Sequence, residues 1–421
     1  MFRFLHAADL HLDSPLRGLE RYDGCPADEV RRASRRALVN LVDLAIGEQV
    51  AFLLVAGDLY DGDLPDYGPC LFLNEQMLRL RDAGIAVFVI QGNHDAASLL
   101  TRHLRLPENV HRFATDHAET RRLDGFDVSI HGQGFATRSV TENLARAYPD
   151  PVVGTFNVGL LHTCVTGREG HDNYAPCTVE ELRAKGYDYW ALGHVHTAEL
   201  LHDDPPIVFP GNLQGRHIRE TGAKGAVLVT VEDGRVTRRE SKPLDVMRWA
   251  VLAVDATGAM GEDDLLDRAR DRLRSLADGA DGRPVAVRVE IRGACRAHDR
   301  LAGRFDRLAA EVRREARDVG AGRLWIEKVA VHTSPEQTGG ALDGPIRAVR
   351  DYLDRLRDDP TRLLEIGRRE LADLKKKLPR GWDEVYGRTP IDAPEQLLAA
   401  LDHLGPELLG GLSGAKWEDV T

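Results

Sequence analysis

The sequence predicts an α/β protein in which a sandwich of β-sheets is flanked by helices and followed by two smaller regions. Three observations support this prediction. The chain has 421 residues, of which 43% are hydrophobic and 29% charged, an ordinary globular composition. Residues 1–243 alternate short apolar runs with amphipathic stretches, and a second such pattern begins after Pro243. Because single hydrophobic cores stop growing at roughly 250–300 residues, this length predicts two or three domains.

Short apolar runs bounded by polar residues and glycine predict the strands of the first domain, residues 1–243. We expect strands at Phe2–Ala7, Ala51–Val55, Ile85–Ile90, Phe126–Ile130, Asn157–Leu161, Tyr189–Leu192, Ile207–Phe209 and Ala226–Val231. We expect helices at Glu29–Ile46, Gly68–Asp82 and Thr178–Lys185. Early alternation of strand and helix, followed by hairpin-like strands, fits a sandwich of sheets flanked by helices.

A small α+β domain is expected at residues 244–333, followed by a mainly helical region at residues 341–421. In the α+β domain we expect strands at Arg248–Val254, Val285–Ile291 and Leu324–His332, and helices at Asp263–Leu276 and Arg300–Asp318. The Ser-Pro-Glu-Gln-Thr-Gly-Gly stretch at Ser334–Gly340 predicts a linker. In the helical region Leu364, Leu371 and Leu378 recur at seven-residue spacing. They would suit the docking of a helical partner, or packing on the chain's own domains.

Composition narrows the class of protein. The five cysteines are scattered without a Cys-x-x-Cys pair, so neither a zinc ribbon nor a disulfide framework is indicated. Apolar runs such as Ile85–Ile90 are far shorter than the roughly 20 residues that a membrane span needs, and Met1–Leu5 leads straight into polar residues, unlike a signal peptide. We therefore expect a cytoplasmic protein without a membrane anchor. The net charge of −11 means that any DNA contact needs a local basic patch or bound metal.

Five polar clusters follow predicted strands, and their residue types are those that bind metal ions. They are Asp9-Leu10-His11, Gly57-Asp58-Leu59-Tyr60-Asp61, Gly92-Asn93-His94-Asp95, Leu160-Leu161-His162-Thr163 and Gly193-His194-Val195-His196. Because sites in α/β proteins gather outside the carboxyl ends of strands, clusters far apart in sequence can meet in one crevice. Carboxylate and imidazole ligands together suit Mn, Fe or Zn ions, whereas an all-oxygen set would indicate Mg or Ca.

Taken singly, each cluster has a simpler interpretation. An isolated aspartate such as Asp9 or Asp58 is more often a turn residue or a helix cap. A strand-end histidine such as His162 is most often structural, and a His-x-His pair also occurs without metal. All five clusters in this order, at strand ends and beside glycines, instead predict a metal site.

In these clusters residues 1–240 resemble the calcineurin-like metallophosphoesterases. The resemblance narrows to the SbcD/Mre-type nucleases and, within them, the YhaO-type exonucleases, on the stretches Gly186–His196 and Phe209–His217. It implies a four-layer sandwich, a capping domain after it, and DNA exonuclease activity in repair or end processing, with endonuclease activity left open. The attack would come from a hydroxide that bridges two divalent ions, expected to be Mn²⁺.

The resemblance also implies roles for individual residues. One ion would be held by Asp9, His11 and His196, the other by Asn93, His162 and His194, with Asp58 bridging both. His94 would contact the scissile phosphate and protonate the leaving oxygen, and Asp95 would orient its ring.

Other positions are less determined by the sequence. Some Mre-type enzymes have a histidine where this chain has Asp61, so a second substrate-contacting histidine is in doubt. His131 follows a predicted strand and either faces the site or is structural, and the loop Gly167–Pro176, with His171 and Asp172, could line a substrate groove. The candidate substrate contacts lie in a basic cluster, which could also be a solvated loop: Arg216, His217, Arg219 and Lys224.

Three functions fit these features. The first is a DNA nuclease, whose relatives work with an SbcC- or YhaN-like coiled-coil ATPase and often form homodimers. The second is a small-molecule phosphodiesterase or nucleotide hydrolase on the same dinuclear site, because metal ligands determine the chemistry and not the substrate. The third is a module that binds DNA ends without turnover.

Overall fold

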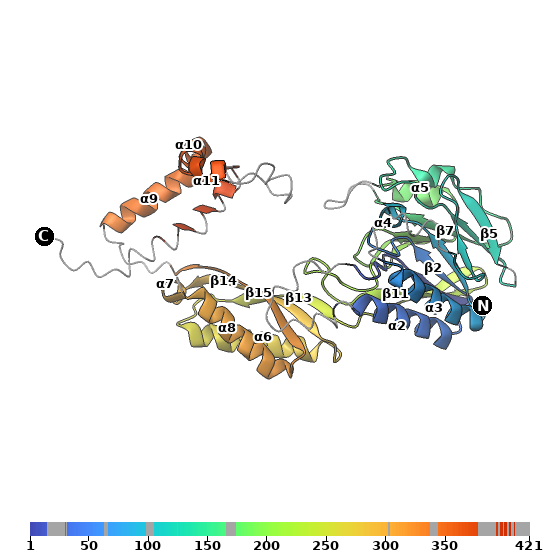
Figure 1. Cartoon of the computed structure of the whole chain (residues 1–421), viewed down its shortest axis with the longest axis horizontal. Coiled ribbons are helices and arrows are strands. Elements are labelled where there is room, and N and C mark those ends of the chain that lie inside the picture. Colours follow the sequence, from blue (N-terminus) through green and yellow to red (C-terminus); the bar gives the residue numbers. More distant parts are fainter. Residues whose placement is uncertain are drawn as a thin grey trace. The chain divides into compact units, whose positions relative to one another are not determined.

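The computed structural model in Figure 1 describes residues 1–14, 30, 32–62, 66–97, 105–123, 125–165, 174–301, 304–336 and 344–377, and scattered positions between 393 and 408. The chain forms two compact units. The first comprises residues 1–251 and 280–287, and the second residues 252–279 and 288–421. The domain limits expected at residues 243 and 333 stay a prediction.

The first unit is built on two six-stranded sheets. The strand order of one sheet is β12 (Arg235–Pro243), β11 (Gly225–Glu232), β1 (Phe2–Ala7), β2 (Phe52–Ala56), β3 (Ala86–Ile90) and β4 (Val110–Arg112). In this sheet β1 to β4 are parallel, whereas β11 runs antiparallel to β1 and β12. The strand order of the other sheet is β5 (Glu119–Leu123), β6 (Val128–Gly132), β7 (Phe156–His162), β8 (Tyr189–Gly193), β10 (Pro206–Phe209) and β9 (Glu199–Asp203). Its central strands β6, β7, β8 and β10 are parallel.

Apolar cores hold the first unit in four layers. Helices α2 (Ala33–Gly47) and α3 (Gly68–Asp82) pack on the outer face of the first sheet through residues such as Leu41 and Leu73. Side chains from both sheets fill the space between them, and Phe4 stacks on Phe52 with ring centroids 4.8 Å apart. On the far side of the second sheet lie the short helices η3 (Leu144–Ala147) and α5 (Val179–Ala184). The predicted four-layer α/β sandwich is confirmed.

A three-stranded sheet has the order β13 (Arg248–Asp255), β14 (Val285–Cys295) and β15 (Leu324–Pro335), and its residues 252–255, 288–295 and 324–335 belong to the second unit. Helices α6 (Glu262–Asp278) and α8 (Phe305–Gly320) pack against each other, and their fully buried leucines Leu273 and Leu308 contribute to the core of that unit. The short helix α7 (His298–Leu301) precedes α8, so the predicted helix at Arg300–Asp318 is interrupted.

The helices that follow are α9 (Gly344–Asp358), α10 (Pro360–Glu370) and α11 (Ala372–Lys377). Leu364 lies on α10, but this helix ends at Glu370 and Leu371 is its C-cap residue. Leu378 lies outside the described residues. The described part of the leucine series therefore does not lie on one continuous helix. Neighbouring residues of α10 pack within the chain, since Leu363 is buried and Gly367, one helical turn later, lies against Leu397.

Four strands were not predicted, namely β4, β5, β9 and β12. All four are edge or near-edge strands with polar sequences, such as Glu-Thr-Arg-Arg-Leu in β5, and they lack the apolar runs on which the prediction was based. His171 and Asp172 lie outside the described residues. Among the described residues no helix is both long and apolar enough to cross a membrane.

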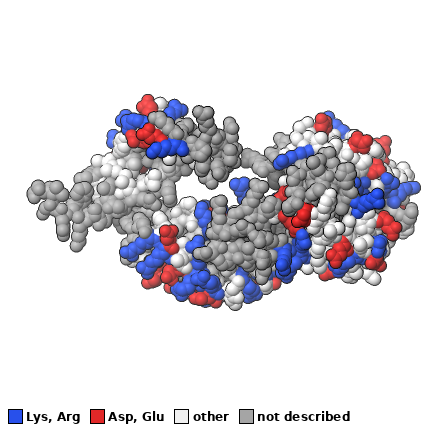
Figure 2. Space-filling view, in the orientation of Figure 1, with Lys and Arg blue, Asp and Glu red and all other residues white. Residues whose placement is uncertain are grey.

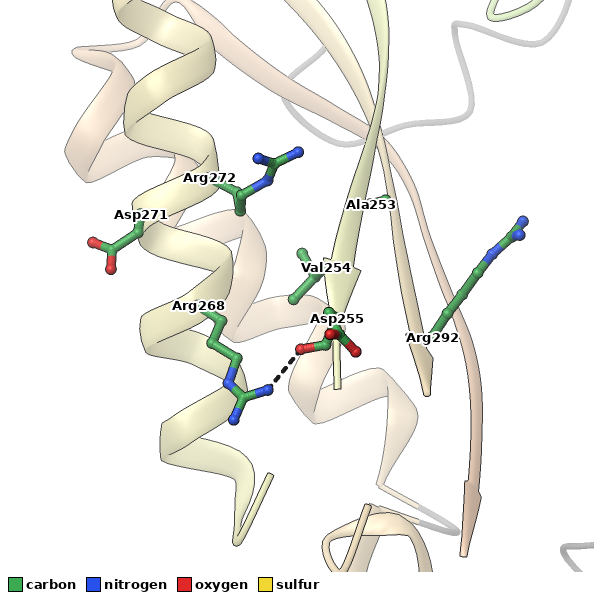
Figure 3. A pocket seen from close by; sticks show the side chains of 7 residues that line it. All are labelled: Ala253, Val254, Asp255, Arg268, Asp271, Arg272 and Arg292. Carbon is green, nitrogen blue, oxygen red and sulfur yellow. Dashed lines mark hydrogen bonds between the residues drawn. The ribbon is translucent and has the colours of Figure 1, made fainter. Parts of the chain in front are cut away.

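Charges of both signs are interspersed over the face of the molecule shown in Figure 2. The second unit has a hollow of about 650 Å³ lined by β13, α6 and Arg292, shown in Figure 3. The guanidinium of Arg268 there is already bound to the backbone oxygens of Asp255 and Thr257 and to Asp264. The hollow is therefore a surface depression of mixed charge, not an assembled anion site.

The close packing of the second sheet gives a test of the fold. A Cβ at Gly159 on β7 would lie 2.3 Å from Cε3 of the fully buried Trp190, so we expect Gly159→Ala to lower the free energy of unfolding by about 1–3 kcal/mol through overpacking. Gly47→Ala, in a position with nothing within 4 Å, is the control and should be neutral or slightly stabilising. Thermal or urea unfolding measures both; equal stability of the two variants would contradict the described packing.

Candidate metal centre

The polar clusters found in the sequence lie where five parallel strands end. Asp9 follows β1, Asp58 follows β2, and Asn93 begins the short helix α4 (Asn93–Ala97) after β3. His162 ends β7, and His194 follows β8. The two sheets meet at these ends, because the ring nitrogen Nδ1 of His162 bonds the backbone oxygen of Ala56 at 2.9 Å.

The loops that carry these clusters have unusual backbone conformations. Asp9, His11, Asp58 and His194 all have positive φ, at 52°, 43°, 53° and 101°. Residues other than glycine rarely adopt this region, and strain of this kind, of order 1–3 kcal/mol per residue, concentrates at functional sites. The loops support each other, since the backbone N–H groups of Asp9 and His11 donate to the oxygens of Gly57 and Asp58, both at 3.0 Å.

Two glycines allow the loops to approach so closely. A Cβ at Gly92 would lie 2.2 Å from Oδ1 of Asp58, and one at Gly193 would lie 1.8 Å from the backbone oxygen of Ala56. No other residue type fits at either position without moving the carboxylate or the strand end.

One group of possible ligands consists of Asp9, His11 and His196, whose ligating atoms lie within 4.8 Å of one another. The Nε2 atoms of the two histidines are 3.2 Å apart. Two nitrogens that are each roughly 2.1 Å from one ion lie roughly 3.0–3.4 Å apart in octahedral or tetrahedral coordination. The spacing therefore fits two imidazoles that share one metal ion.

A second group consists of Asp9, Asp58 and His162. The Oδ2 atom of Asp58 is 3.6 Å from Nε2 of His162 and 3.9 Å from Nε2 of His11, so this carboxylate approaches a histidine of each group, as a bridging ligand would. With Nδ1 of His162 donating to Ala56, its Nε2 lone pair faces Oδ1 of Asn93 at 2.9 Å. Two acceptors that face each other at this distance fit a cation between them.

His194 lies beside the second group. Its backbone N–H donates to both carboxylate oxygens of Asp9, at 3.0 and 3.2 Å. Its ring is 5.2 Å from that of His162 and 5.5 Å from that of Tyr174, measured between centroids. The structure thus brings together all seven residues for which the sequence predicted metal binding, and their role as ligands stays a prediction.

The electrostatics of the cluster favour a bound cation. Asp9 and Asp58 are each only 1% exposed. Burial and the neighbouring charge of Asp58 raise the pKa of Asp9 well above its usual range. Burial also lowers the pKa of His11 and of His162 to about 3, which keeps both rings neutral and able to bind metal. Buried carboxylates beside neutral imidazoles form a donor set that a divalent cation would complete.

His94 lies next to this donor set and contacts Asp61. Its Nδ1 is 2.8 Å from Oδ1 of Asp61, whose other oxygen accepts a hydrogen bond from Ser14 at 2.6 Å. Burial alone would lower the pKa of His94, but the bond to Asp61 and the charge of Asp58 outweigh it and raise the pKa. Burial alone would raise the pKa of Asp61, but hydrogen bonds from His94 and Ser14 and the nearby ring of His11, 3.6 Å away, hold it far below its usual range and keep Asp61 ionised.

Asp95 is bound by backbone amides, and its expected role at the His94 ring stays a prediction. The carboxylate of Asp95 accepts hydrogen bonds, all at 3.1 Å, from the backbone N–H groups of Leu59, Tyr60 and Gly92. It therefore joins the loops after β2 and β3, whereas Asp61 supplies the carboxylate at the His94 ring. Burial and the nearby charge of Asp58 raise the pKa of Asp95 to about 7.

His131 is a structural residue and does not face the candidate site. Its Nδ1 bonds Thr120 at 2.8 Å, its Nε2 bonds Asn157 at 3.0 Å, and its ring stacks on Tyr187. Both ring nitrogens are engaged within the second sheet, which agrees with the structural alternative of the sequence analysis.

Arg216 lies at the cluster, and His217 at its edge. The guanidinium Nη1 of Arg216 is 3.6 Å from Oδ2 of Asp61, while Nη2 is 3.0 Å from Oε1 of Glu220. His217 has a side chain 53% exposed and lies 3.4 Å from the same Glu220 oxygen. The basic cluster of the sequence therefore also contains a buried acidic residue, Glu220. The sequence analysis did not identify Glu220, because it lies in no motif.

Comparison with known proteins gives consistent matches. Residues 2–198 match the family Calcineurin-like phosphoesterase, and residues 249–334 match the family Metallophosphoesterase YhaO, middle domain. The chain is 38% identical over 294 residues to the uncharacterized metallophosphoesterase YhaO of Bacillus subtilis, covering 69% of this chain and 71% of that protein. It is 25% identical to the DNA double-strand break repair protein Mre11 of Methanopyrus kandleri, covering 94% of this chain and 87% of that protein.

Two solved structures also match at low similarity. One is TT1561 of Thermus thermophilus, at 13% identity and a TM-score of 0.31, over 57% of this chain and 98% of that one. The other is a dimetal phosphatase from Danio rerio, at 12% identity and a TM-score of 0.34, over 55% of this chain and 93% of that one. Scores this low do not bear on function.

The donor set predicts that divalent metal stabilises the fold. We expect Mn²⁺ at about 100 times its dissociation constant to stabilise the protein by about 2.7 kcal/mol, and so to raise Tm by roughly 5–10 °C. EDTA should reverse the shift, and Gly92→Ala, which displaces the Asp58 carboxylate, should largely abolish it. The exposed His117, which pairs with Asp116, supplies the control variant His117→Ala, and this should respond like the wild type. Equal Tm values with Mn²⁺ and with EDTA would contradict the predicted metal centre.

Proposed function

This chain belongs to the calcineurin-like phosphoesterases and carries a middle domain of the YhaO type, and from that premise we propose that it is a Mn²⁺-dependent phosphodiesterase that cuts DNA. The proposal rests chiefly on one observation. Two groups of metal-binding side chains share Asp9, and Asp58 of the second group also lies 3.9 Å from His11 of the first, with the His94–Asp61 pair beside them. Calcineurin-like phosphoesterases use dinuclear metal sites, so the donor set and the family point to the same chemistry.

Each residue has a proposed role. Asp9, His11 and His196 hold one ion, Asn93, His162 and His194 hold the other, and Asp58 bridges them. When bound, such a pair of ions makes hydroxide available near neutral pH and offsets the negative charge on the phosphate. The mixed nitrogen and oxygen donors suit Mn²⁺, which is the ion we propose.

His94 is the proposed general acid. With its Nδ1 bonded to Asp61, the ring has Nε2 free to donate a proton to the leaving oxygen of the cleaved ester. The raised pKa of His94 keeps the protonated form available near neutral pH. Asp61 holds the ring in place and stabilises its positive charge, which is the role first expected of Asp95.

DNA is the proposed substrate because of the relative named as a DNA double-strand break repair protein, whose similarity extends over nearly the whole chain. The net charge of −11 opposes non-specific binding to DNA, so local contacts must provide it. Arg216 is the candidate nearest the cluster, since its guanidinium lies within 3.6 Å of Asp61. An exonuclease acting in DNA end processing is the function that we propose.

Protein partners form part of the same proposal. Helix α3 exposes Leu71 by 66% and Leu78 by 37%, with Tyr67 at its N-cap exposed by 54%, and these residues lie near one face of the helix. We propose that this face lies in a homodimer interface. The charged helices α9 to α11 are the proposed docking region for a coiled-coil ATPase of the SbcC or YhaN kind.

The first test is hydrolysis of labelled linear double-stranded and single-stranded DNA with Mn²⁺. We expect cleavage by the wild type and a loss of about 10²–10⁴-fold or more in His94→Ala, which removes the general acid, and in Asp58→Ala, which removes the bridging ligand. The His117→Ala variant should cleave normally. Turnover of a small diester alone would replace DNA by a small-molecule substrate, and metal binding without any turnover would favour a DNA-binding module.

A second test separates the acid from the metal ligands. Bis(p-nitrophenyl) phosphate has a leaving group that needs no proton, so Asp61→Ala should cleave it nearly as well as the wild type while losing roughly tenfold or more on DNA. Mn²⁺ is supplied at a saturating concentration, because Asp61 also lies 3.6 Å from Nδ1 of His11, a proposed ligand. Asp66→Ala, which removes an exposed aspartate that bonds the N–H of Gly68, is the matched control. Equal losses on both substrates would contradict the proposed role of Asp61.

A further inference from the structure

Glu220 is a buried acidic residue among the residues of the basic cluster, and it lies against a candidate metal ligand. It is 5% exposed, and its Oε1 atom is 2.7 Å from Nδ1 of His196. Its other oxygen, Oε2, accepts hydrogen bonds from the backbone N–H of Arg216 at 2.7 Å and from the side-chain amide of Asn212 at 2.9 Å. The carboxylate is therefore fixed in position by groups that do not belong to the metal centre.

This contact determines which nitrogen of His196 faces the centre. The guanidinium of Arg216 also approaches Nδ1 of His196, at 3.2 Å, and as a donor it would require a lone pair on that atom. The Glu220 contact is shorter and joins a carboxylate to the ring, so Nδ1 carries the hydrogen and donates it to Glu220. The Nε2 lone pair of His196 then faces His11 and Asp9, at 3.2 and 3.9 Å.

The loop that carries Glu220 is anchored on the side away from the cluster. The indole N–H of Trp249 donates to the backbone oxygen of Gly215 at 3.0 Å, and the N–H of Gly222 donates to the oxygen of Trp249 at 3.1 Å. A Cβ at Gly215 would lie 2.8 Å from the backbone oxygen of Glu220 and 3.0 Å from Cδ1 of the Trp249 ring. Lys224 completes the support by donating to the backbone oxygen of His196 at 2.7 Å.

We propose that Glu220 is a positioning residue, which selects the metal-binding tautomer of His196 and at the same time holds Arg216 at the edge of the centre. The proposal rests on the metal site proposed above and adds to it a residue that acts through a ligand. Partners of this kind fix the ring orientation of a ligating histidine, and their removal typically weakens metal affinity by about 10–100-fold.

The experiment is a calorimetric titration of the metal-free full chain with Mn²⁺. The wild type should bind two ions. Glu220→Gln has the same shape without the charge, and it should bind one ion about 10–100-fold more weakly and the other unchanged. A general loss of structure would weaken both sites and lower the Tm of the metal-free protein, so Tm is measured in parallel.

Two further variants sharpen the comparison. Glu119→Gln is the matched control, because the Glu119 carboxylate also bonds a histidine, His111 at 2.9 Å, outside the cluster; it should bind both ions like the wild type. Arg216→Gln should keep the affinity for both Mn²⁺ ions while raising KM for DNA. This result would separate the contact of Glu220 with His196 from its contact with Arg216.

The outcomes distinguish this inference from the proposed function. Unchanged affinities in Glu220→Gln would overturn the inference even if the wild type cleaves DNA. One selectively weakened site would support it even if DNA proves not to be the substrate. A wild type that binds no Mn²⁺ would overturn both.

Discussion

The constraint on which the first unit depends is the burial of many electron-pair donors in one place. Asp9 and Asp58 are almost fully buried, and the neutral rings of His11 and His162 lie against them. Burying ionised carboxylates without a compensating charge is costly, and acceptors that face each other at hydrogen-bond distance add to that cost. The strained loops and the close approaches at Gly92 and Gly193 maintain this arrangement, which a divalent cation would turn from unfavourable to favourable.

The sequence predicted the fold best where the chain is apolar. The runs that became β1, β2, β3, β7 and β8 are almost wholly buried, and each polar cluster follows such a run, so strand ends and candidate ligands were identified together. Polar edge strands such as β5 and β12 carry no such signal, because none of their side chains is fully buried and their pairing is set by the neighbouring strand.

The site shows the same division between local and long-range information. Metal-binding residue types in short motifs could be read from the sequence, but their supporting contacts could not. In the sequence, Asp61 and Asp95 each lie within a few residues of a predicted metal ligand, so the sequence does not distinguish their roles. Only the folded loops show that Asp61 contacts His94 while Asp95 bonds backbone amides. Glu220 contacts His196, which is 24 residues away in the sequence. The surroundings of the His131 side chain are set by residues of the second sheet that are also distant in the sequence.

The hydrogen bond from Trp249 to Gly215 bears on how this protein could have been assembled from parts. Trp249 is the first residue that matches the YhaO middle domain, yet it supports the loop of the first unit that carries Glu220. The residues that match the middle domain are therefore not independent of the first unit. Recombination that exchanged the middle domain at residue 249 would also exchange a support of the loop that carries Glu220, so the two parts of the chain are expected to be inherited together.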